Sequence, residues 1–148
     1  MLQTLSKKEI KELNEKISRY KISFDVKDRV QKARNLFLQN GVPMLFELGG
    51  TIYPTLKNTT LIFPHVYVDK GAIPFVVKGA DLMRPGIISV EEFPKESSVF
   101  IADAEHKKNL ALGLAMYSST EIKAMDKGKV IKNLHYVGDE IWDFSPKK

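Results

Sequence analysis

The chain has 148 residues, 43% of them apolar, with nine glycines, seven prolines and no cysteine. This length and composition fit one or two small globular domains and exclude fibrous, disordered and disulfide-rich proteins, thiolate zinc sites and cysteine nucleophiles. No apolar run approaches the roughly 18 residues that cross a bilayer, and the amino terminus turns polar early, so we expect a cytoplasmic protein with no membrane partner.

The net charge of +5 is distributed unevenly. Residues 1–64 contain eleven Lys and Arg against six Asp and Glu, whereas residues 65–148 contain twelve of each, so the whole excess lies in the first half. Such a bias attracts phosphate backbones through counterion release without selecting a sequence. The alternative is that these lysines only solvate a helix and a strand.

The first predicted element is a helix that begins after Ser6. Ser6 and Glu9 have the spacing of a capping box, and Ile10, Leu13 and Ile17 then repeat at helical intervals. From residue 20 to residue 26, apolar and polar residues alternate, which predicts a half-buried strand.

Turn residues punctuate the next stretch. Asn40-Gly41 favours a type I′ turn and predicts a hairpin of strands at about 35–39 and 42–48. Gly49-Gly50 should end the second strand, and Pro54 is placed to begin a short helix. Pro64 marks the expected boundary between an amino-terminal α+β domain, residues 1–64, and a second domain, residues 65–148, packed against it.

Short strands dominate the second half. Apolar runs and turn signals predict strands near 66–68, 98–103, 110–117, 130–137 and 140–144. Ser118 and Glu121 repeat the capping-box spacing, and Gly128 is expected to end the helix that they begin. Short strands with two small helices are typical of a compact β-barrel, so the fold class is α+β.

No catalytic or metal centre is evident. The chain lacks GxSxG, Walker and HExxH motifs, and its three histidines are far apart in sequence. Adjacent carboxylates on a strand point to opposite faces and cannot converge on one atom. We therefore expect no catalytic residue, no metal ligand and no cofactor.

The segment 68–86, VDKGAIPFVVKGADLMRPG, is the most informative part of the sequence. Asp69 can cap a helix that begins near Lys70, and Gly71 and Ala72 keep its surface low. Glycine and proline shape the loop that follows, while lysine and arginine side chains surround it. This combination predicts a ledge of side-chain-poor main chain on which a polyanion can lie close. The alternative is a structural turn whose glycines and proline serve only the barrel.

Seven ordered pieces of the second half, among them VDKGAI, KGADLMRPGI and NLHYVGDEIW, resemble the PUA domain, an RNA-binding barrel. IYPTL and Pro64-His65 resemble the junction between a pre-PUA and a PUA domain in the family of the T-cell-amplified oncoprotein, ligatin and their archaeal relatives. The resemblance implies binding of tRNA or rRNA, and association with the small ribosomal subunit and a protein that carries an initiation-factor-like domain.

On this basis the candidate RNA-binding residues form the helix-and-loop face and one late strand. They are Lys70, Gly71, Ala72, Lys78, Gly79, Ala80, Asp81, Arg84, Pro85, Gly86, His135 and Tyr136. Two other functions remain open, a protein adaptor and a detached recognition subunit of an RNA-modifying enzyme. His135 and Tyr136 could stack on a base or pack in the barrel. Trp142 is expected to be a core anchor.

Overall fold

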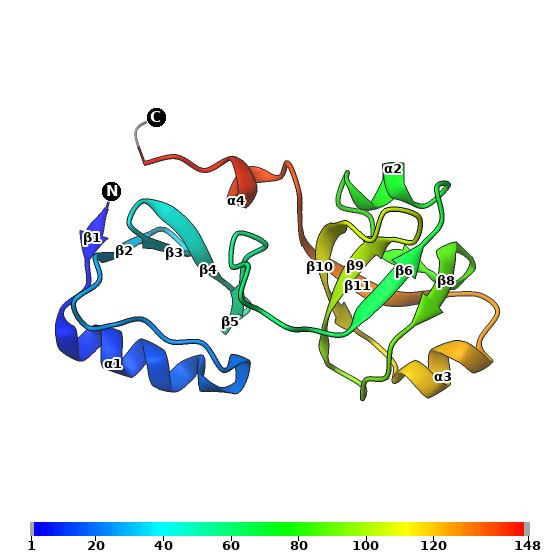
Figure 1. The fold of residues 1–148 in the computed structure, drawn as a ribbon, viewed down its shortest axis with the longest axis horizontal. Coiled ribbons are helices and arrows are strands. Elements are labelled where there is room, and N and C mark those ends of the chain that lie inside the picture. Colours follow the sequence, from blue (N-terminus) through cyan, green and yellow to red (C-terminus); the bar gives the residue numbers. More distant parts are fainter. Residues whose placement is uncertain (1, 147–148) are drawn as a thin grey trace. The chain divides into compact units, whose positions relative to one another are not determined.

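The computed structural model describes residues 2–146, which form two compact units, one of residues 2–61 and 140–146 and the other of residues 62–139 (Figure 1). The division differs from the domain boundary expected from sequence mainly at the carboxy-terminal segment. That segment contains α4 (Glu140–Asp143), which contacts β4 of the first unit.

The first unit is a five-stranded antiparallel sheet in the order β1-β2-β3-β4-β5 with helix α1 packed on it. The elements are β1 (Gln3–Thr4), α1 (Lys7–Lys16), a 3₁₀ turn (Ser18–Tyr20), β2 (Val30–Ala33), β3 (Leu36–Gln39), β4 (Val42–Leu48) and β5 (Thr51–Pro54). Ile10, Leu13 and Ile17 of the helix side are buried against the sheet. The predicted capping box of Ser6 and Glu9 is confirmed, as is the Asn40-Gly41 hairpin, whose two turn residues have φ of 51° and 85°.

The second unit is a curled six-stranded sheet in the order β7-β11-β10-β9-β6-β8, with one parallel pair, β6 and β9. Its elements are β6 (His65–Val68), α2 (Ile73–Val76), β7 (Leu82–Met83), a 3₁₀ turn (Arg84–Gly86), β8 (Ile87–Val90), β9 (Ser98–Asp103), β10 (Asn109–Ala115), α3 (Ser119–Ala124) and β11 (Lys129–Tyr136). Its core is mostly aliphatic and includes Val66, Val99, Ile101 and Ile131, all fully buried. The predicted α+β class is confirmed.

The strand predicted at residues 20–26 is wrong. Lys21 adopts a left-handed conformation with φ of 58°, which interrupts the extended chain. The backbone of Phe24 then forms its hydrogen bonds with the Asn14 side chain and not with a neighbouring strand. Asn14 Nδ2 donates to the Phe24 carbonyl at 2.9 Å and Asn14 Oδ1 accepts from the Phe24 N–H at 2.8 Å. The alternating apolar residues still reach the core, because Phe24 is buried and Ile22 and Val26 pack beside it.

Three further predictions are wrong. Pro54 ends strand β5 and begins no helix, because Gly49-Gly50, with φ of 58° and 81°, turns the chain back onto β4. Residues 140–144 are not a strand, since the Asp139 carboxylate accepts the Tyr136 N–H, the chain turns at Gly138, and α4 follows. Helix α3 ends at Ala124, and Gly128, with φ of 99°, instead shapes the turn before β11.

Among residues 2–146, none of the helices has both the length and the apolar character that crossing a membrane requires.

The double hydrogen bond between Asn14 and Phe24 generates a stability prediction. We expect Asn14→Ala to destabilise the first unit by about 1–2 kcal/mol, since two hydrogen bonds are lost and the alanine recovers a little helix propensity. Urea unfolding followed by the fluorescence of Trp142, the one tryptophan of the chain and part of this unit, measures the change. Glu12→Ala, on an exposed position of the same helix, is the control and should stay within about 0.5 kcal/mol. Equal midpoints for the two variants would contradict the assigned role of Asn14.

Candidate nucleic-acid interface

The helix of the candidate interface begins three residues later than the sequence predicts. The Asp69 carboxylate accepts the Ala72 N–H at 3.0 Å, which closes a turn, and α2 starts at Ile73 with Pro74 in its first turn. A proline there costs no hydrogen bond, because the first N–H groups of a helix have no partner within it. Gly71 and Lys70 therefore lie in an exposed turn before the helix, and Lys70 forms an exposed ion pair with Glu105 at 3.3 Å.

A polar clasp fixes the chain that follows α2 against β11. The Asn133 side-chain amide donates to the carbonyls of Val76 at 3.0 Å and Ala80 at 3.1 Å, and its backbone N–H donates to Asp81 at 2.8 Å. Burial raises the pKa of Asp81, but the hydrogen bonds from Asn133 and Lys129 and the charge of Lys132 outweigh it. The pKa of Asp81 is therefore lowered, and its carboxylate is ionised at neutral pH.

Two of the predicted ledge glycines serve close packing. An added Cβ at Gly79, where φ is 93°, would lie 2.9 Å from the Tyr136 ring. At Gly86 it would lie 2.9 Å from the Cβ of Ala72, so Gly86 lets the 3₁₀ turn approach the start of α2. Both glycines are partly buried and pack against side chains of the chain itself, which favours a structural role for them.

Arg84 is engaged within the protein. Its Nε donates to the Ile122 carbonyl at 2.7 Å and its Nη1 to the Ile87 carbonyl at 3.4 Å. Two of the three guanidinium nitrogens thus tie the 3₁₀ turn to α3 and β8. This does not match the expected role of Arg84 as a fork for phosphate.

The two aromatic candidates on β11 point inward. His135 is fully buried, with Nδ1 2.8 Å from the Asp139 carboxylate, so its ring has no surface to offer a base. Tyr136 is partly buried and packs against the barrel core and Gly79. Of the two possibilities open for these residues, the structure favours packing.

The remaining candidates, Lys78, Ala80 and Pro85, are exposed, and they adjoin a surface feature that sequence reasoning missed. Phe75 and Met83, 66% and 47% exposed, stand at a pocket of about 270 Å³ beside α2. The rest of this apolar pocket is formed by Ala72, Val76, Ala80, Asp81, Leu82 and Gly86. One signal could have revealed Phe75, because five successive apolar residues, 73–77, cannot all face the core from one turn of helix.

A second hollow, the lysine groove, meets the apolar pocket at Asp81. It has a volume of about 430 Å³, and Lys95, Lys129 and Lys132 line it together with Glu96. Lys129 forms an ion pair with Asp81 at 3.1 Å and lies opposite Met83 in the pairing of β7 and β11. Apolar surface and cations therefore adjoin, an arrangement that suits a base and its phosphate.

Within the described residues, no group of three or more His, Asp or Glu side chains lies close enough to hold a metal ion.

Two alanine variants can separate the stability cost of a clash with Tyr136 at residue 79 from the cost of placing a side chain at positive φ. Gly79→Ala and Gly138→Ala both place a side chain at φ near 94°, but an added Cβ at Gly138 meets nothing within 4 Å. We expect Gly138→Ala to cost about 1–2 kcal/mol from backbone strain, and Gly79→Ala to cost about 1–3 kcal/mol more from the clash with Tyr136. Thermal unfolding by circular dichroism gives the two values. Similar losses in both variants would mean that Tyr136 moves aside without cost.

Comparison with known proteins agrees with this architecture. A family model described as the PUA domain matches residues 64–137, and a model described as a domain of unknown function, DUF1947, matches residues 3–68. The solved PUA-domain structure from Aeropyrum pernix, a tartrate complex, superposes with a TM-score of 0.81 and 30% identity, covering 97% of this chain and 89% of that one.

Three relatives extend the likeness. An uncharacterised protein of Methanocaldococcus jannaschii is 38% identical over 95% of this chain and 94% of its own. Translation machinery-associated protein 20 of Saccharomyces cerevisiae is 34% identical over 80% of this chain and 68% of its own, and Malignant T-cell-amplified sequence 1 of Danio rerio is 38% identical over 74% and 65%. The chain therefore belongs to the family of PUA-domain proteins in which a DUF1947 region precedes the PUA domain, as the sequence resemblance indicated.

Proposed function

We propose that the protein is a non-catalytic, cytoplasmic RNA-binding protein of the translation apparatus, and that it holds an unpaired base of a tRNA or ribosomal RNA at the apolar pocket beside α2. The observation that carries this proposal is the exposure of Phe75 and Met83 at a pocket flanked by lysines. An exposed aromatic ring beside cations is the arrangement with which proteins bind unstacked bases and their phosphates.

On the surface beside α2, the aromatic ring and the lysines are suited to different parts of a nucleotide. A base can stack on Phe75, while Lys78, Lys129 and Lys132 lie where the phosphates on either side can reach them. The eleven Lys and Arg of residues 1–64 add attraction for the phosphate chain that does not depend on sequence.

The translation part of the proposal rests on the relatives. One relative carries an association with the translation machinery in its name, and this chain covers 68% of its length. We extend that association to this protein, with the small ribosomal subunit and a protein carrying an initiation-factor-like domain as its expected partners. Crosslinking that maps the bound RNA at nucleotide resolution tests this part, and crosslinks confined to RNAs outside translation would exclude it.

The role of the exposed ring is tested by Phe75→Ala. Loss of base stacking should weaken binding of a single-stranded RNA by about 1–3 kcal/mol, as measured by fluorescence anisotropy. Ile88→Ala is the matched control, because Ile88 is 61% exposed in the same unit and does not line the apolar pocket. Equal affinities of the two folded variants would place the RNA elsewhere.

The role of the lysines is tested through salt dependence. Lys78→Ala and Lys132→Ala should each reduce the slope of log K against log salt by about 0.7, since each removes one phosphate contact with a single strand. Lys123→Ala, an exposed substitution on α3, removes the same charge away from the pocket and the groove and should leave the slope nearly unchanged. A uniform loss in all three variants would indicate a diffuse charge effect with no assigned contact.

A further inference from the structure

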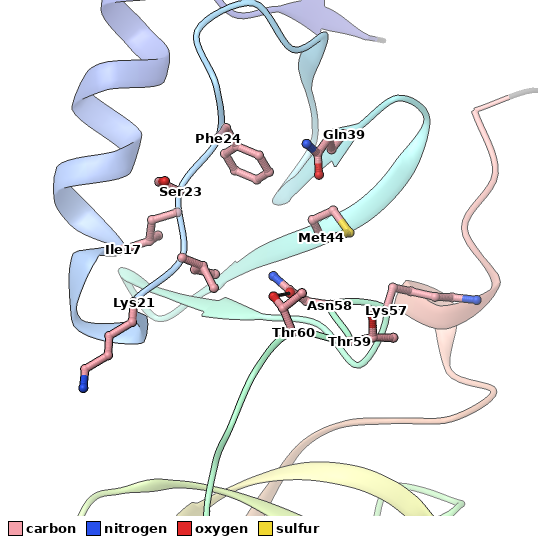
Figure 2. Close-up of a pocket in the computed structure, with 11 residues that line it drawn as sticks. Ile17, Lys21, Ser23, Phe24, Gln39, Met44, Lys57, Asn58, Thr59 and Thr60 are labelled. Carbon is pink, nitrogen blue, oxygen red and sulfur yellow. Dashed lines mark hydrogen bonds between the residues drawn. The ribbon is translucent and has the colours of Figure 1, made fainter.

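The first unit contains a pocket of its own, between the loop that follows the 3₁₀ turn and the loop that follows β5 (Figure 2). Its volume is about 300 Å³, at the lower end of the roughly 300–1,000 Å³ of small-molecule pockets. Figure 2 shows Phe24, Gln39, Met44 and Asn58 around this hollow, which we call the amide pocket.

Both loops are held in place without a ligand. Asn14 fixes one of them through its two hydrogen bonds to the backbone of Phe24. The fully buried Thr55 fixes the other: its hydroxyl donates to the Pro43 carbonyl at 2.7 Å and accepts the Lys57 N–H at 3.2 Å, and its carbonyl accepts the Asn58 N–H. The pocket is therefore preformed, which lowers the entropic cost of binding.

The polar atoms of the pocket include one acceptor of fixed orientation. Gln39 Nε2 donates to Asp28 Oδ2 at 2.8 Å, and a carboxylate can only accept, so Gln39 Oε1 is the atom left for a ligand. Asn58 Oδ1 accepts from the Thr60 hydroxyl at 3.0 Å, the contact drawn in Figure 2. Among residues 2–146, Asn58 Nδ2 donates to no protein acceptor, so the pocket offers a donor as well as an acceptor.

The apolar part of the pocket is a ring and a thioether. Phe24 and Met44 supply flat or adaptable apolar surface, and Lys21 lies at the rim with its side chain directed away from the hollow in Figure 2. A planar heterocycle with donors and acceptors on its edge matches the interior of the pocket. If this heterocycle is the base of a nucleotide, the sugar and phosphate have to remain outside the pocket, on the side of Lys21. The excess of eleven Lys and Arg over six Asp and Glu in residues 1–64 favours an anionic ligand.

We propose that the amide pocket holds one unstacked nucleotide of the bound RNA, with the base between Phe24 and Met44 and its edge hydrogen-bonded to Gln39 and Asn58. This inference rests on the proposed function, because it supplies a second contact, on the first unit, for the same class of ligand. Amide side chains read base edges while aromatic and thioether groups hold base faces.

The test uses the full chain labelled with ¹⁵N and titrated with a single-stranded oligoribonucleotide and, separately, with nucleoside 5′-monophosphates. We expect the RNA to shift the side-chain NH₂ signals of Gln39 and Asn58 as well as the backbone signals around Phe75. Gln39→Ala should weaken RNA binding roughly tenfold and remove only the pocket shifts. Gln31→Ala, which removes an amide from the neighbouring strand β2 outside the pocket, should leave the affinity unchanged.

A second variant guards against an indirect effect of Gln39→Ala on Asp28. Thr60 is exposed, lines the pocket and lies beside Asn58 in Figure 2, so Thr60→Trp can place a bulky ring at the hollow, and it should weaken RNA binding to a similar degree. Wild-type affinity in this folded variant would overturn the inference.

The outcomes separate the two proposals. RNA that shifts the signals around Phe75 but not those of Gln39 and Asn58 overturns the amide pocket and leaves the proposed function standing. RNA that shifts neither set overturns both proposals. If the monophosphates alone shift the pocket signals, the ligand is a free nucleotide and RNA is overturned as its source.

Discussion

The candidate RNA-binding surface depends on one polar clasp, the three hydrogen bonds from Asn133 to the chain between Val76 and Asp81. A helix of four residues such as α2 is not stable by itself, because the conformational entropy lost on nucleation exceeds the stabilisation from so few hydrogen bonds. The Asn133 amide on β11 stabilises this segment by donating to the carbonyl of Val76, at the end of the helix, and to that of Ala80, in the loop that follows. Phe75 can then project from a rigid support, although its own element contributes almost no rigidity.

The same constraint explains why glycine recurs in this segment. Since Asn133 and Asp81 hold the chain directly against β11, Tyr136 comes to lie over residue 79, and only a residue without a side chain fits there. Gly86 permits the corresponding approach at the other end, where the 3₁₀ turn meets Ala72. These two glycines therefore allow close packing within the protein. The surface available to a ligand is formed by the apolar residues that the Asn133 clasp leaves exposed.

The parts of the fold that could be predicted from sequence are those decided by neighbours along the chain. The two capping boxes and the Asn40-Gly41 turn involve residues within three positions of each other, and all three are present. The failures have distant causes. Asn14 holds Phe24 away from a strand conformation from ten residues away, and Arg84 meets the carbonyl of Ile122, 38 residues along the chain. Alternation at 20–26 correctly marked which residues face the core, because a period of two alone places them on one side of an extended chain, whereas a strand also needs a hydrogen-bonded partner strand.

The candidate site follows the same rule. The resemblance and the apolar pocket beside α2 point to the same segment of the chain. Arg84 and His135 were assigned to a ligand because the sequence shows the chemistry of a side chain but not its partners in the fold. In the structure both are engaged within the protein, Arg84 by carbonyls and His135 by Asp139. The lysines differ, since a long side chain ending in a strongly hydrated charge rarely finds an internal partner, and Lys78 and Lys132 are exposed as expected for solvated cations. Cations of this kind give affinity without choosing a base, so in the two proposed contacts any selectivity has to come from the few uncharged groups, the ring of Phe75 and the amides of Gln39 and Asn58.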